Sequence, residues 1–189
     1  MSTLNEYLGQ KRQAVLVRNA RDPQTVTPVK LRAHVSAEGR SGVRRIRIRD
    51  HQVVSDSPAD FAGYDLGPSS PELLLGSLGS CLTHIFLIKA AELELPLESL
   101  EVEIEGDLDP RGGKPGYEKV PFFPHNIRYT AHIVSPADES AVRAVHEAVE
   151  QWCPILNLLK QPQPLEGSVR HTRPSAPCLL YTSPSPRDS

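Results

Sequence analysis

A long apolar run opens with Ser70-Pro-Glu-Leu-Leu-Leu-Gly-Ser-Leu-Gly-Ser-Cys81 and sets the architecture of the chain. Ser70 followed by Pro71 and Glu72 is typical of a helix start. Serine caps the first free N–H groups, proline fits the first position, and an acidic side chain suits the first turn. The sequence therefore predicts a helix over residues 70–93. Because apolar side chains surround most of it, we expect this helix to be buried.

One stripe of this helix is small and polar, with Ser77, Cys81 and His84 at i, i+4 and i+7. A free cysteine is most often an inert core residue, but its small polar surroundings weaken that interpretation. A reactive thiol must ionise. The helix dipole acts on the first turn, and Cys81 lies beyond that turn. A cationic partner is therefore expected from His84, unless its ring is neutral and buried, or from Arg40 in a glycine-rich turn.

Cys153 precedes Pro154 at a predicted junction between two helices. A residue before proline is pushed out of the helical region, so the backbone here is less constrained than in mid-helix. Such freedom suits a thiol that must move to meet another sulfur, although a buried structural cysteine gives the same pattern.

Runs of strands and helices surround the long helix, and this order favours an α+β fold. The clearest strands alternate Arg with Ile in 43–50 and acidic with apolar residues in 100–109. Their charged faces would complement each other if the two strands paired, or could be solvated independently. The other predicted elements are strands over 29–35, 127–134 and 165–170, a loop over 56–70, and helices over 3–12, from about 135 to 152, and over 155–159.

The composition narrows the class of protein. With 189 residues, 39% hydrophobic and 23% charged, the chain is expected to be one globular domain. A net charge of -2 gives no electrostatic reason to expect nucleic-acid binding. The apolar run over 72–95 carries charges, so no membrane partner is expected, and the N-terminus has no secretory apolar region. Sparse cysteines in an unsecreted chain indicate a reducing, cytoplasmic compartment, and no motif predicts a metal or cofactor.

The last residues are not expected to belong to the fold. Residues 178–188 resemble the in-frame translation of a sequencing-library adapter, and the alternative is a natural disordered tail rich in Pro and Ser. On the adapter interpretation the natural chain is cut near Pro177, and Cys178 is not a native thiol. The organisation expected is an N-terminal extension over 1–27, a domain over 28–172 and a tail over 173–189.

Three motifs together resemble the OsmC/Ohr family, the osmotically inducible and organic-hydroperoxide-resistance proteins. They are the helix motif ending at Cys81, the acidic strand Leu100-Glu-Val-Glu-Ile-Glu-Gly-Asp-Leu-Asp109, and Trp152-Cys-Pro-Ile-Leu-Asn157. The resemblance covers roughly residues 28–172. It implies an OsmC-like fold, in which a β-sheet packs around a long buried central helix, and an intertwined homodimer with active sites at the subunit interface.

The same resemblance implies a thiol peroxidase that reduces organic hydroperoxides, with Cys81 peroxidatic and Cys153 resolving. It implies reduction by a dithiol, either a lipoylated protein or a small thiol. Catalytic members also use an arginine and a glutamate. Arg40 matches the arginine, with Arg44 and Arg45 as alternatives, while Glu72 lies one residue nearer the cysteine than the family's glutamate. That departure favours the broader OsmC-like group, and leaves open a non-catalytic module that binds an apolar ligand, or a thiol redox sensor.

Overall fold

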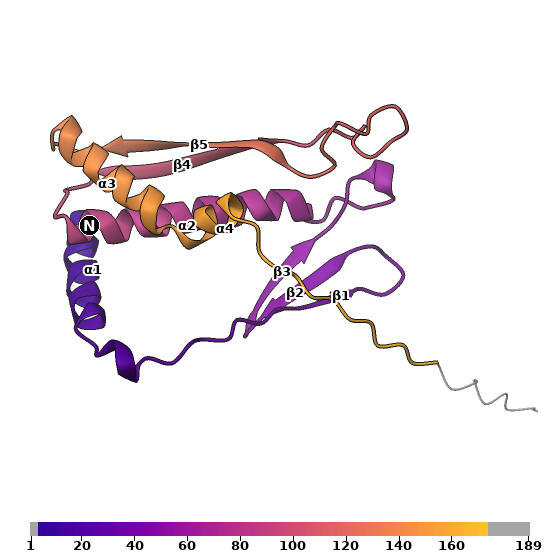
Figure 1. Cartoon of the computed structure of the whole chain (residues 1–189), viewed down its shortest axis with the longest axis horizontal. Helices are drawn as coiled ribbons and strands as arrows, with labels where there is room; N and C mark the ends of the chain where they lie inside the picture. The colour runs from indigo at the N-terminus through magenta and orange to yellow at the C-terminus, as the bar shows by residue number, and fades with distance from the viewer. Residues whose placement is uncertain (1–3, 174–189) are drawn as a thin grey trace, which may run out of the picture.

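The computed structural model describes residues 4–173 and has the predicted α+β composition (Figure 1). Three strands precede the long helix α2, and a two-stranded hairpin and two further helices follow it. The elements are α1 (Leu4–Asn19), β1 (His34–Ala37), β2 (Arg44–Ile48), β3 (His51–Ser55), α2 (Ser70–Glu92), β4 (Ser99–Asp107), β5 (His125–Val134), α3 (Glu139–Trp152) and α4 (Pro154–Lys160).

Helix α2 forms over almost the predicted residues, but its cap is Ser69 and not Ser70. The Ser69 N–H donates to Glu72 Oε2 at 2.7 Å, and the Ser69 carbonyl accepts the Leu73 N–H at 2.9 Å. Ser70 and Pro71 are therefore already inside the helix. The correction is one residue, and its reason is that two neighbouring serines offer the same capping chemistry.

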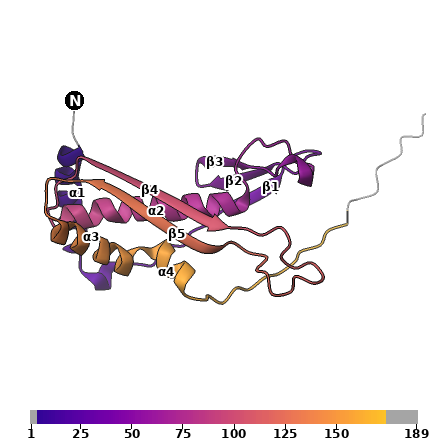
Figure 2. The same ribbon diagram turned by 90° about the horizontal axis from the view of Figure 1, so that it is seen from above.

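The core lies where α2 meets the hairpin on one side and helices α3 and α4 on another (Figures 1 and 2). Leu78, Leu82 and Phe86 recur every four residues along α2 and are fully buried. Val145 and Val149 of α3 are buried against the same cluster. Each such side chain contributes about 1.5–3 kcal/mol by leaving water. By length and composition alone, α2 is also long and apolar enough to cross a membrane. The core helix of a globular protein meets the same two criteria.

The hairpin pairs β4 with β5 in an antiparallel register, and its burial alternates along both strands. Apolar side chains such as Ile104 face the core. The opposite face is charged, with Glu105 bonded to Arg128 at 2.7 Å and Glu103 to His132 at 3.2 Å. The acidic strand therefore finds its basic partners on β5. Of the two alternatives left open by the sequence, pairing with the arginine strand does not occur, because β2 and β4 belong to separate sheets.

The N-terminal strands form a separate sheet in the order β1-β2-β3, which stands away from α2 in Figure 1. Val35, Ile46 and Val53 are cross-strand neighbours and form one apolar stripe. Val35 is 53% exposed and Val53 is 38% exposed, so this stripe is uncovered within one chain. Strand β1 begins at His34, not at residue 29, because the preceding residues have no strand to pair with.

Both ends of the domain differ from the sequence prediction. Helix α1 continues to Asn19, well beyond residue 12, and buries Leu8 and Val15. Its Asn5 Oδ1 accepts the Leu97 N–H at 2.8 Å, which attaches the extension to the core. The strand predicted over 165–170 is absent; these residues are exposed and unpaired in the described part of the chain. The adapter-like residues 178–188 lie outside the described residues.

Candidate active site

The two cysteines singled out by the sequence meet in the structure. Cys153 Sγ lies 3.5 Å from Cys81 Sγ, although the residues are 72 apart in the chain. Both are free thiols; Cys81 is partly exposed and Cys153 is 0% exposed. A disulfide requires about 2.05 Å between sulfurs, so a small movement would join them.

The local backbone explains why Cys153 lies at this place. Cys153 ends α3 and precedes α4 with φ -71° and ψ 113°, the extended conformation that Pro154 imposes. The Asn157 side chain fixes this junction because its Nδ2 donates to three carbonyls: Cys153 O at 2.8 Å, Glu150 O at 3.2 Å and Gln151 O at 3.2 Å. The junction that the sequence predicts to be loosely held is therefore braced by a side chain.

The two thiols have different surroundings. Burial raises the pKa of Cys153, the N–H groups of Leu156 and Ile155 oppose this, and the neighbouring Cys81 adds to the increase. Cys153 is therefore a protonated, buried thiol at neutral pH. Since only a thiolate is a strong nucleophile, this asymmetry favours Cys81 as the first group to react.

Cys81 opens onto a shallow, open cavity of about 670 Å³ along one face of α2. Its floor is the stripe of small residues along α2, which leaves room above the thiol. The lining residues are Pro68, Glu72, Leu73, Gly76, Ser77, Ser80, Cys81 and His84. Within the described residues, no group of His, Cys, Asp or Glu side chains is placed to hold a metal ion.

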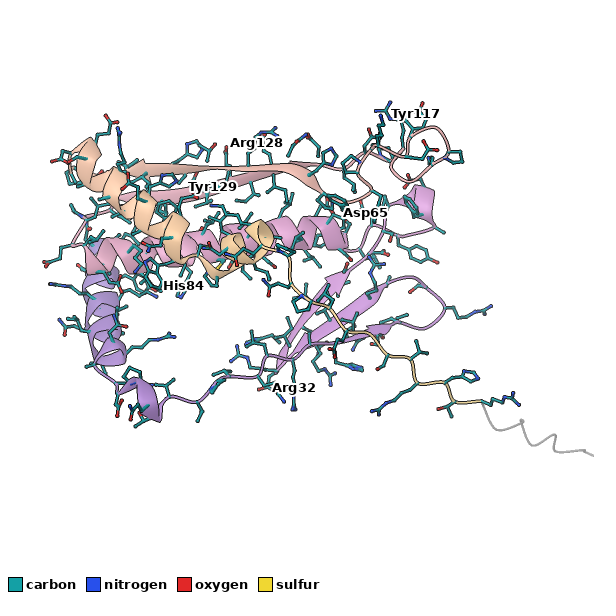
Figure 3. The ribbon with its side chains drawn as sticks, viewed as in Figure 1. Arg32, Asp65, His84, Tyr117, Arg128 and Tyr129 are labelled. Carbon is teal, nitrogen blue, oxygen red and sulfur yellow. The ribbon has the colours of Figure 1, made fainter. Side chains whose placement is uncertain are left out.

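His84, which is labelled in Figure 3, lines this cavity but does not supply a positive charge. Burial lowers the pKa of His84 first, and the nearby cations Lys11 and Arg18 of α1 lower it further. The ring is therefore neutral at pH 7. Of the two interpretations that the sequence leaves open for His84, the lowered pKa therefore favours the neutral ring over the cation beside Cys81.

The three candidate arginines differ in the groups that their side chains contact. Arg44 donates to Asp56 O at 2.7 Å and to Ser55 Oγ at 3.1 Å, and it is held inside the N-terminal sheet. Arg45 pairs with Glu38 at 3.2 Å. Arg40 is exposed in the turn between β1 and β2, and its side chain forms no hydrogen bond or ion pair within residues 4–173. Of the three, Arg40 alone is free in this part of the chain, but it does not line the Cys81 cavity of its own chain.

Glu72 lines the cavity, but its carboxylate is occupied. The Ser69 hydroxyl donates to Glu72 Oε2 at 2.6 Å, and this bond with the Ser69 N–H lowers the pKa of Glu72. The structure therefore assigns Glu72 a capping contact and brings it to no arginine within residues 4–173.

Sequence patterns alone missed one polar cluster near Cys153. His146 and Glu150 have the i, i+4 spacing of an ordinary surface pair, whereas both contact the hydroxyl of Tyr129 from β5. The only available signal was that Tyr129 occupies an inward position in the alternation of its strand.

A family model for the OsmC-like protein matches residues 63–167, which include both cysteines and α2. The chain belongs to the OsmC-like family. Arg40 and α1 lie outside the matched segment. No curated protein matches the sequence.

Solved structures of OsmC-like proteins have the same fold. An OsmC-like protein from Mycoplasma pneumoniae is 17% identical with a TM-score of 0.61, over 71% of this chain and 89% of that one. An organic hydroperoxide resistance protein OsmC from Legionella pneumophila is 15% identical with a TM-score of 0.52, over 71% and 92%. A putative organic hydroperoxide resistance protein from Vibrio cholerae, with captopril in one active site, is 18% identical with a TM-score of 0.52, over 74% and 90%.

Proposed function

We propose that this OsmC-like protein is a thiol-dependent peroxidase that reduces organic hydroperoxides to alcohols through a Cys81–Cys153 disulfide. The observation that carries the proposal is the 3.5 Å contact between an accessible and a buried thiol. The names of the Legionella and Vibrio proteins, which refer to organic hydroperoxide resistance, support the substrate class.

The chemistry has two steps. The Cys81 thiolate attacks the distal peroxide oxygen, the O–O bond breaks, and the departing alkoxide takes a proton to leave as an alcohol. Cys81 is then a sulfenic acid. The Cys153 thiol attacks the Cys81 sulfur, the S–O bond breaks, and the hydroxyl leaves as water with the thiol proton. The partly apolar cavity favours a lipophilic hydroperoxide over hydrogen peroxide.

The burial of the two sulfurs indicates how the disulfide would be reduced. Cys153 is fully buried, so a reductant reaches only the Cys81 sulfur, through the same cavity. Attack there forms a mixed disulfide with Cys81 and releases Cys153, whose sulfur is close to the N–H groups of Leu156 and Ile155. We propose a dithiol reductant, either a lipoylated protein or a small thiol, because its second thiol can then release Cys81. A reducing, cytoplasmic location fits this cycle.

A homodimer would supply the cation that the lining of the Cys81 cavity lacks in one chain. The uncovered stripe of Val35, Ile46 and Val53 needs a partner, since a small sheet with two open faces is marginally stable alone. In the intertwined dimer that we propose, Arg40 of the partner subunit completes the Cys81 cavity and stabilises the thiolate and the developing alkoxide. Glu72 would contribute by capping α2.

The test is intact mass with a free-thiol count, before and after one equivalent of cumene hydroperoxide. We would use the full chain carrying Cys178→Ser, so that only two thiols are counted. We expect both thiols to be lost, with about 2 Da, within seconds. Cys81→Ser should abolish the reaction, whereas Cys153→Ser should stop at a sulfenic acid.

A second candidate function is a non-catalytic OsmC-like module that binds an apolar ligand in the Cys81 cavity. The engaged carboxylate of Glu72 favours it, because the family's arginine–glutamate pair cannot form without breaking the cap. Two intact thiols minutes after peroxide addition would exclude the peroxidase and leave this candidate.

A further inference from the structure

A hydrogen-bonded cluster joins three elements beside the second cysteine. Tyr129 of β5 donates its hydroxyl proton to a carboxylate oxygen of Glu150, on α3. His146 Nε2 lies 2.7 Å from the same hydroxyl oxygen, and Lys160 of α4 donates to the other Glu150 oxygen at 2.5 Å. Tyr129 is labelled on β5 in Figure 3. Because the tyrosine has one proton and gives it to Glu150, His146 must be the donor to Tyr129.

Glu150 and Tyr129 each keep one protonation state around neutral pH. The bonds from Lys160 and Tyr129 lower the pKa of Glu150, which is therefore ionised. Burial and the Glu150 charge raise the pKa of Tyr129, which therefore keeps its proton. Hydrogen bonds to an ionised acceptor are stronger than those between neutral groups. The bonds to the Glu150 carboxylate therefore attach β5 and α4 to α3. The His146 ring also stacks on Phe86, with centroids 6.1 Å apart and an interplanar angle of 7°.

The attachment spans the junction that holds Cys153. Glu150 lies in the last turn of α3, three residues before the cysteine, and Lys160 ends α4 on its other side. Their ion pair thus bridges the extended residue that separates the two helices. Tyr129 ties this bridge to the hairpin, while Asn157 holds the carbonyls of the same turn. A thiolate charge at Cys153 would add to the raised pKa of Tyr129, so the two side chains are within electrostatic reach.

We propose that Tyr129 is a positioning residue for Cys153: by anchoring Glu150, it holds the α3–α4 junction so that the Cys153 sulfur stays opposite Cys81. The inference rests on the proposed peroxidase and deepens its second step. Tyr129 acts through Glu150 and contacts no reacting atom. Its role matters because the Cys81 sulfenic acid has two fates. It condenses with Cys153 and releases water, or it takes an oxygen from a second hydroperoxide to become a sulfinic acid while a second alcohol leaves.

The test substitutes Tyr129→Phe in the full Cys178→Ser chain, which removes only the hydroxyl. The protein is treated with excess cumene hydroperoxide, the reaction is quenched at intervals, and the intact mass is measured by mass spectrometry. The disulfide loses about 2 Da and the sulfinic acid gains about 32 Da. We expect the oxidation rate of Cys81 to be unchanged, disulfide formation to slow about tenfold, and the sulfinic product to increase. Tyr64→Phe removes an exposed hydroxyl and is the matched control, with no expected change.

The outcomes separate this inference from the function on which it rests. If the unsubstituted protein forms no disulfide, the peroxidase proposal fails and this inference fails with it. If that protein forms the disulfide and Tyr129→Phe gives the same product ratio, only the inference is overturned. If Tyr129→Phe does not fold, Lys160→Met decides, because it removes the exposed end of the cluster. It should slow disulfide formation about threefold, and an unchanged ratio would overturn the inference.

Discussion

The two sheets of this protein differ in how far their apolar faces are covered within one chain. The β4–β5 hairpin has one face covered by the core helix, and its other face carries paired charges such as Glu105 and Arg128. The β1–β3 sheet leaves its apolar stripe of Val35, Ile46 and Val53 open. One chain thus covers the half that holds both cysteines, whereas in the half that holds Arg40 the apolar stripe would be covered only in the dimer that we propose. Substitutions in each half can test this contrast.

The largest effect is expected in the completed half. Leu82 is fully buried between α2 and its neighbours, so Leu82→Ala removes apolar contacts and leaves a cavity. The free energy of unfolding should fall by about 2–5 kcal/mol, measured by urea denaturation. Leu93→Ala, at an exposed position after the same helix, is the control. A loss below about 1 kcal/mol for Leu82→Ala would show that this half is not packed as the structure has it.

The next effect concerns the charge that the incomplete half would bring to Cys81. Arg40→Ala should slow Cys81 oxidation by cumene hydroperoxide about 10²-fold, because it removes the cation that stabilises the thiolate and alkoxide. Stability should be unchanged, since the side chain is exposed and unengaged in the described chain. Arg45→Ala, which breaks only the pair with Glu38, is the control. Equal rates for both variants would remove Arg40 from the mechanism.

A smaller effect is expected on assembly. Val35→Asp places a charge in the uncovered apolar stripe and should weaken the dimer at least about tenfold, measured by analytical ultracentrifugation. Val54→Asp introduces the same charge on the opposite face, where Val54 neighbours Arg45. Should Val54→Asp alone dissociate the dimer, the covered face would be the arginine face, and the contrast would have to be redrawn.

The smallest effect concerns the cap of α2. The pKa of Glu72 is lowered from its ordinary value of 4.5, so its stabilising contribution is present above that value and lost as pH falls through the lowered one. Glu72→Gln should therefore decrease the urea midpoint at pH 7 and change it little in strong acid. Glu101→Gln controls for loss of one negative charge. A midpoint difference that persists in acid would mean that the cap does not depend on the carboxylate charge.

Much of the fold could be predicted from the sequence, because the signals are local. The apolar run and helix start predicted α2 to within a residue at its start, and Pro154 predicted the extended backbone of Cys153. The alternation of acidic and apolar residues in 100–109 predicted β4, and a strand was predicted over 127–134, where β5 forms. The errors concern elements whose state depends on a partner strand. Residues 165–170 are predicted as a strand but pair with nothing within residues 4–173, whereas His51–Ser55, for which no strand is predicted, pairs as β3.

The residues alone singled out two thiols, and they showed which side-chain types lie beside Cys81 on the same helix. Folding was needed to show that Cys81 and Cys153 meet at 3.5 Å, that His84 is neutral, and that Glu72 serves a cap. The cause of this division is distance along the chain. Periodicity and capping act within a few residues, whereas burial, pKa and the meeting of two sulfurs depend on elements packed together from distant segments.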